Sequence, residues 1–161
     1  MTSKLPTLAQ RIEAIEQAYE FMLAYAAQGR EDEGGGSVRQ FLERAADALD
    51  GLAAAAASSP SGQEVTSHPA FAVFLEVVEA DARKAGSALR IVLAQKSISS
   101  QLVDNLNASI HLRALLTDVF LLDEVLKRGE GWYGATEAGS DRARSDGLAH
   151  RNPAAAQRIS S

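Results

Sequence analysis

Residues 100–127 read SQLVDNLNASIHLRALLTDVFLLDEVLK and give the strongest indication of the fold class. In the first half of this segment, apolar residues recur every three to four positions, which is the period of an amphipathic helix. From 114 to 122 only Thr117 and Asp118 are polar, so apolar side chains cover most of the helix circumference. A helix that is apolar nearly all round must be buried on more than one side. We therefore predict a long helix here, packed inside an all-α fold.

Working outward, three further segments carry the same helical period, namely residues 8–26, 38–56 and 69–95. Each begins with a residue type that favours a helix start: Thr7 before the first, Ser37 with Gln40 as a capping box before the second, and Pro69 in the third. Four helices joined by polar connections predict an antiparallel four-helix bundle. Residues 58–69 are rich in Ser, Gly, Pro and Thr without periodicity, so we expect a long connection there.

The last 33 residues differ in composition from the rest. Residues 129–161 are rich in Gly, Ala and Ser and carry almost no periodic apolar residues, so we expect a flexible tail. This divides the chain into a helical bundle domain, 1–128, and a tail, 129–161. The tail holds the only tryptophan, Trp132, within a Gly-Trp-Tyr-Gly segment that either packs on the protein itself or anchors a partner.

Composition excludes several classes of function. The 161 residues contain no cysteine, which rules out disulfides, thiolate metal sites and cysteine nucleophiles. The net charge is -5, and the predicted helical part contains no cluster of Lys and Arg of the kind that nucleic-acid binding requires. No apolar run reaches the ~20 residues of a membrane span, and the N-terminus shows no signal peptide. We expect a cytoplasmic protein that neither binds nucleic acid nor spans a membrane.

No motif supports catalysis. The chain contains no Glu-x-x-His pair for a di-iron site, no phosphate-binding glycine loop and no Gly-x-Ser-x-Gly nucleophile elbow. We expect a non-enzymatic protein without metal or cofactor.

The surplus of apolar residues in 114–122 is more than one bundle core requires, because each helix of a small bundle normally keeps a solvent face. We interpret the surplus as an interface for a homodimer or another protein, with the tail covering it as the alternative. The interface residues predicted are Leu115, Leu116, Val119, Leu122 and Trp132.

Arg113 lies on the apolar side of the predicted last helix, where a cation needs a carboxylate partner or an anionic ligand. The alternative function is therefore a bundle that binds a small apolar or anionic ligand. The cavity would be lined by Arg113, Tyr19, Phe74 and Phe120.

His111 stands in the middle of the predicted last helix. An exposed histidine on a four-helix bundle resembles the arrangement of histidine phosphotransfer domains, which implies a phosphoryl-acceptor role for His111. Those domains carry a lysine and a small residue one turn after the histidine, where this chain has Ala114 and Leu115. The leading expectation remains a protein-binding adaptor, regulator or accessory subunit.

Overall fold

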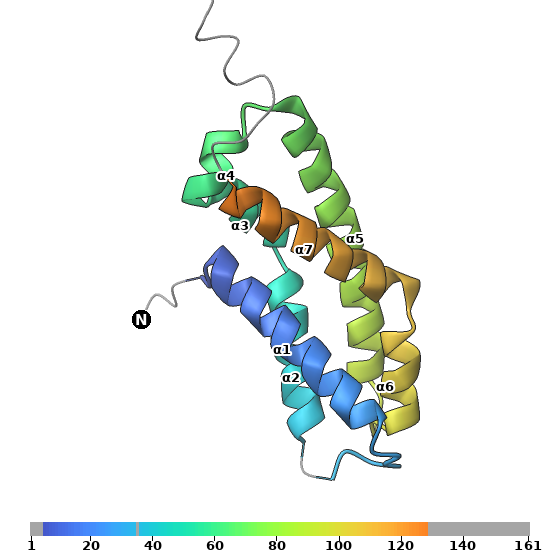
Figure 1. The fold of residues 1–161 in the computed structure, drawn as a ribbon. Coiled ribbons are helices and arrows are strands. Elements are labelled where there is room, and N and C mark those ends of the chain that lie inside the picture. The colour runs from blue at the N-terminus through green and yellow to red at the C-terminus, as the bar shows by residue number, and fades with distance from the viewer. Residues whose placement is uncertain (1–4, 35, 129–161) are drawn as a thin grey trace, which may run out of the picture. The chain divides into compact units, whose positions relative to one another are not determined.

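The computed structural model describes residues 5–34 and 36–128, and within these residues the chain forms seven helices and no strand (Figure 1). The all-α prediction is confirmed. The helices are α1 Leu8–Ala26, α2 Ser37–Leu49, α3 Leu52–Ser58, α4 Pro60–Val65, α5 Pro69–Leu93, α6 Ser100–Asn107 and α7 Ile110–Lys127. None of them is long and apolar enough to cross a bilayer.

The starts of α1 and α5 follow the local signals in the sequence. Gln10 N donates to Thr7 Oγ1 at 3.3 Å, and Thr7 N donates to Gln10 Oε1 at 2.9 Å, which completes a capping box. Pro69 occupies the first turn of α5, where its missing N–H costs least. Ser99 caps α6 through a 3.2 Å hydrogen bond from Leu102 N. These boundaries were predictable because each depends on residues within one turn.

The arrangement of four helices is not what the structure shows, because two predicted helices are interrupted and one predicted connection is helical. Gly51 adopts the left-handed conformation (φ 75°) and separates α2 from α3. Ser109 is extended (ψ 126°) and separates α6 from α7. Within 58–69, Ser59 accepts a hydrogen bond from Gly62 N at 3.0 Å and starts α4.

The N-terminal cap predicted at Ser37 is wrong. Ser37 is the first residue of α2, and the cap position belongs to Gly36 (φ 81°), which supplies no side-chain hydrogen bond. The left-handed backbone at Gly36 places Ser37 one residue too late for its hydroxyl to serve as the cap.

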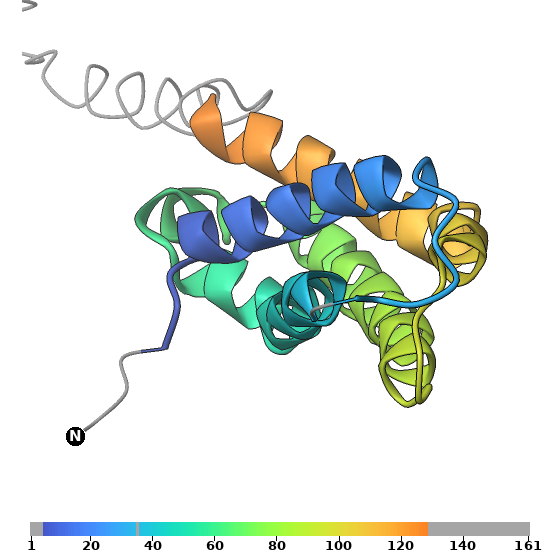
Figure 2. The same ribbon diagram turned by 90° about the horizontal axis from the view of Figure 1, so that it is seen from below.

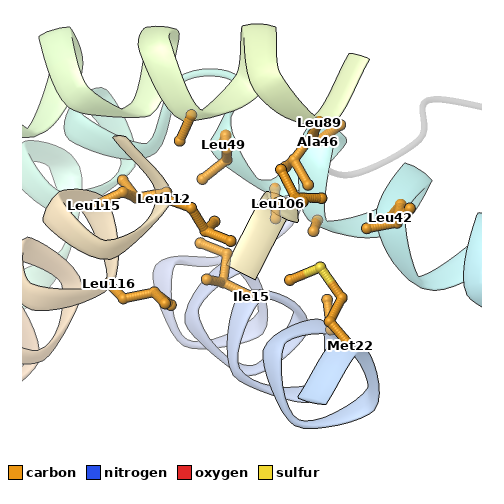
Figure 3. Packing of buried hydrophobic residues seen from close by; sticks show 14 of the residues in the cluster. Ile15, Met22, Leu42, Ala46, Leu49, Leu89, Leu106, Leu112, Leu115 and Leu116 are labelled. Carbon is orange, nitrogen blue, oxygen red and sulfur yellow. The ribbon is translucent and has the colours of Figure 1, made fainter. Parts of the chain in front are cut away.

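The core lies where α1, α2, α5, α6 and α7 meet. Helix α1 packs on α2 and α6, while α5 packs on α2, α3 and α7 (Figures 1 and 2). Figure 3 shows Ile15 and Met22 of α1 pointing toward leucines of four other helices. The leucines labelled there are Leu42, Leu49, Leu89, Leu106, Leu112, Leu115 and Leu116. Leu52 and Ala53 of α3 belong to the same apolar cluster, which therefore holds six of the described helices together.

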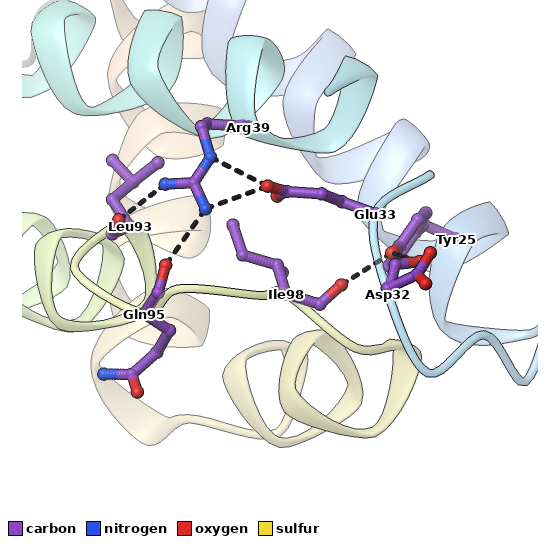
Figure 4. A network of polar contacts seen from close by, with 7 residues as sticks. All are labelled: Tyr25, Asp32, Glu33, Arg39, Leu93, Gln95 and Ile98. Carbon is purple, nitrogen blue, oxygen red and sulfur yellow. Dashed lines mark hydrogen bonds and ion pairs between the residues drawn. The ribbon is translucent and has the colours of Figure 1, made fainter. Parts of the chain in front are cut away.

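Backbone carbonyls at the α5–α6 connection are satisfied by side chains of distant elements (Figure 4). Arg39 donates to Leu93 O at 2.7 Å and to Gln95 O at 3.0 Å, and it pairs with Glu33 at 3.0 Å. The Tyr25 hydroxyl lies 2.7 Å from Ile98 O and 2.9 Å from Asp32 O and donates to one of them at a time. These bonds fix the loops at one end of the core.

Candidate functional site

Helix α5 presents apolar side chains on two sides. Its inner side buries Val78, Ala85 and Leu89 in the core. On the outer side Val73, Val77 and Ile91 are 61%, 44% and 63% exposed. They belong to a row spaced alternately four and three residues apart, which we call the outer stripe of α5: Val73, Val77, Ala80, Lys84, Ser87 and Ile91.

This spacing keeps the row on one face of the helix over its whole length, as in the seam of a coiled coil. From Val73 to Ile91 the stripe spans 18 residue steps, which at a rise of 1.5 Å each is about 27 Å. The intrachain core uses the opposite face of α5, where Val78, Ala82 and Leu89 are buried. The outer stripe is therefore a long, partly apolar face that the described part of the chain does not cover.

One edge of α5 meets α7 through two carboxyl groups. Asp118 of α7 is only 8% exposed, and its buried Oδ2 receives no hydrogen bond. It shares a hydrogen bond with Asp81 of α5. Burial, followed by the charge of Asp81 and this hydrogen bond, raises the pKa of Asp118 to about 6.

The pKa of the partner carboxyl group, that of Asp81, is shifted in the opposite direction. Lys84 donates to Asp81 at 2.9 Å, and this hydrogen bond is the main reason that the pKa of Asp81 lies below its ordinary value. Since Asp118 has the higher pKa, it carries the proton at acidic pH, and its protonated carboxyl group donates a hydrogen bond to the carboxylate of Asp81. The proton therefore stabilises the Asp81–Asp118 pair, which is one polar contact between α5 and α7.

Exposed apolar residues flank this carboxyl pair. Val77 lies one turn before Asp81 on α5, and Leu121, which is 52% exposed, lies one turn after Asp118 on α7.

The residues predicted as an interface lie elsewhere. Leu115, Leu116, Val119 and Leu122 are all buried against other helices of the same chain. The surplus that we assigned to a partner is used internally, because α7 lies among α4, α5 and α6 and buries more than one side. The exposed apolar residues of α7 are instead Ile110, Phe120 and Leu121. Trp132 lies outside the described residues.

The residues predicted to line a ligand cavity are separated. Arg113 and Phe120 are exposed on α7, whereas Tyr19 and Phe74 are half-buried and pack against the core. Tyr19 lines an internal cavity of only about 10 Å³. The expected position of Arg113 on the apolar side of the helix is corrected: at 3.6 residues per turn, Arg113 lies on the opposite side of α7 from the buried residue Leu122.

His111 is exposed near the start of α7, and its charge contributes to lowering the pKa of Asp81. Among the residues that the structure describes, no three His, Asp or Glu side chains are placed to hold a metal ion.

Arg11 is a buried residue that the sequence reasoning missed. It is 6% exposed and donates to four backbone carbonyls, those of Pro6, Asp47, Ala48 and Asp50, at 2.6–3.4 Å. It thereby satisfies carbonyl groups at the C-terminal end of α2. A signal was present, because Arg11 continues the four-three spacing of the buried residues Ile15, Ala18 and Met22.

Comparison of the chain with protein-family models, with curated proteins and with solved structures gave no match.

Proposed function

We propose that this protein is a non-enzymatic adaptor or accessory subunit that binds another protein through the outer stripe of α5. The observation that supports the proposal is the row of exposed apolar residues at coiled-coil spacing, led by Val73, Val77 and Ile91. Apolar side chains that recur on one helix face are a typical recognition surface for a second helix.

The charges beside the stripe favour a partner helix that carries carboxylates. Arg83, Lys84 and Arg90 lie in its C-terminal half. Lys84 pairs with Asp81 and Arg90 with Asp50, whereas Arg83 forms no ion pair with the described residues. A partner with Asp or Glu opposite Arg83 would gain from this local positive charge. The proposed partner is therefore an amphipathic helix with an apolar stripe and an acidic edge.

A second copy of this chain fits the stripe less well. In an antiparallel pair about the middle of the stripe, the two Arg83 side chains would face one another and repel. The same register places Glu76 opposite Arg90 of the other copy, but Arg90 already pairs with Asp50 in its own chain. The homodimer that we predicted from the sequence is tested by the mass in solution across a hundredfold concentration range. We expect the monomer mass of 17.1 kDa, whereas a persistent mass of twice that value would contradict the proposed acidic partner.

Site-specific photocrosslinking tests the proposal. Benzoylphenylalanine is placed at position 77, and cells that produce the protein are irradiated. We expect one defined crosslinked adduct, in which the crosslinked segment of the partner is an amphipathic helix with an acidic edge. The matched control is position 23 on α1, because Leu23 is 48% exposed, comparable with Val77. Equal adducts at both positions, no adduct at position 77, or an adduct between two copies would each contradict the proposal.

Charge reversal adds a second test of partner chemistry. Arg83→Glu should reduce the adduct from position 77, since it places like charges opposite the acidic edge. Arg113→Glu is the matched control, because Arg113 is an exposed arginine on α7 outside the stripe. An adduct that is unchanged by Arg83→Glu would contradict the acidic partner.

A further inference from the structure

A groove lies at the end of the molecule where α1 begins and α7 ends. Its walls come from the first turns of α1, from α3, from the start of α4 and from the last turns of α7. Its volume is about 820 Å³. Small-molecule sites in proteins commonly measure about 300–1,000 Å³, so the groove is large enough for a ligand.

The apolar lining of the groove is aliphatic. Leu8 and Ile12 of α1 face Ala54 and Ala55 of α3, and Leu126 of α7 closes a further side. Among the residues that the structure describes, none that lines the groove is aromatic. Because aromatic faces are absent, stacking cannot select a planar ring, and the lining suits a flexible hydrocarbon chain.

The charged side chains at the groove are already paired within the chain. The guanidinium of Arg11 donates to backbone carbonyls, including that of Asp50 at 2.6 Å. The carboxylate of Asp50 pairs with Arg90 at 2.7 Å, and Lys127 pairs with Asp123. Within residues 5–34 and 36–128, two cations and two anions therefore line the groove, and each has a partner from this chain. A charged ligand would have to break one of these contacts to gain its own.

We propose that this groove is a binding site for an uncharged aliphatic molecule, such as a medium-length alkyl chain with a neutral polar end. The aliphatic walls bury the hydrocarbon, which is favourable in proportion to the apolar area removed from water. The neutral end lies toward the polar rim, where Thr7, Ser58 and Ser61 line the groove. This site is separate from the outer stripe of α5 and does not depend on the function proposed there.

Titration of the full-length chain with octan-1-ol, followed through its methyl NMR signals, tests the proposal. We expect saturable shifts for Leu8, Ile12 and Leu126, and no saturable shift for Leu42, which is buried elsewhere in the core. Octanoate and octylammonium of the same chain length should bind at least tenfold more weakly. The absence of saturation, or equal binding of a charged analogue, would overturn the proposal.

A substitution that fills the groove provides the matched variant. Ala54→Phe places a ring in the groove from α3 and should weaken octan-1-ol binding at least tenfold, whereas Ala24→Phe, at an exposed alanine of α1 outside the groove, should leave it unchanged. Ala9→Phe fills the groove from the α1 side and repeats the test if Ala54→Phe unfolds the protein. Unchanged affinity in a folded groove-filling variant would show that octan-1-ol binds elsewhere and would overturn the proposal.

Discussion

Replacing Asp118 by asparagine should make the protein more stable at neutral pH and should remove a step in its pH dependence. The amide of asparagine can still donate a hydrogen bond to Asp81, but it carries no charge. In the native protein, ionisation of Asp118 above its pKa places two carboxylates together in a buried contact between α5 and α7. The substitution keeps the hydrogen bond and removes the repulsion.

The magnitude follows from the raised pKa. In the unfolded chain Asp118 has the ordinary pKa of 3.8, whereas in the folded protein its pKa is about 6. The stability contributed by the proton is complete below about pH 3.8 and is lost as the pH rises through about 6. At about 1.4 kcal/mol per pKa unit, the loss amounts to about 3 kcal/mol. The pKa of Asp81 is lowered, so Asp81 contributes stability at neutral pH, and this stability is lost as the pH falls below the ordinary carboxyl range.

Urea unfolding followed by circular dichroism, at a series of pH values from about 4 to 7.5, measures this effect. Asp118→Asn should equal the native protein near pH 4 and exceed it by up to about 3 kcal/mol at pH 7.5. Asp104→Asn on α6 is the control, because Asp104 is exposed and its removal changes the net charge equally. Parallel pH profiles for the native protein and Asp118→Asn would refute the reasoning.

Other substitutions test the structural contacts by the same unfolding assay. Arg11→Met should destabilise the protein by about 3 kcal/mol, because it leaves buried carbonyls of α2 without a donor, and a loss below about 1 kcal/mol would contradict that role. Gly51→Ala should cost about 1–2 kcal/mol because Gly51 has φ 75°. By contrast, Gly86→Ala should stabilise α5 by about 0.5–1 kcal/mol, since an added Cβ meets the far end of the long Arg90 side chain at 2.9 Å, which a small shift of that side chain relieves, and Leu49 at 3.9 Å. The opposite order of the two glycine variants would refute this. Tyr25→Phe should cost about 1 kcal/mol through its lost hydrogen bond, and an unchanged midpoint would show that the bond contributes nothing.

The helical fold class and the ends of two helices were predictable from sequence because they depend on near neighbours. The start of α1 at Thr7 and the start of α5 at Pro69 rest on hydrogen bonds and backbone restrictions within one turn. The interruptions at Gly51 and Ser109 were missed because the apolar period continues across both. A period shows which side chains are apolar but does not show whether the backbone turns between them.

The candidate site depends on contacts between segments distant in the sequence, and these were not predictable. Leu115 and Leu122 have the same apolar character whether a partner or the chain itself covers them, and the packing of α7 among neighbouring helices buries both. The helical period does place Val78 on the core side of α5 and Val77 on another side, but it does not show whether another helix of the chain covers Val77. The sequence shows an aspartate at 118, but its raised pKa depends first on burial among the packed helices and then on Asp81, 37 positions away in the chain.

The apolar period alone was sufficient to predict an all-α fold, because helix formation is governed by interactions over three to four residues. Composition alone excluded cysteine chemistry. The assembly of seven helices determined which apolar face became core, which stayed exposed on α5 and where a groove remained between α1, α3, α4 and α7. Burial and desolvation are set by the elements that surround a side chain in space, so these properties emerge from the packing of the folded chain.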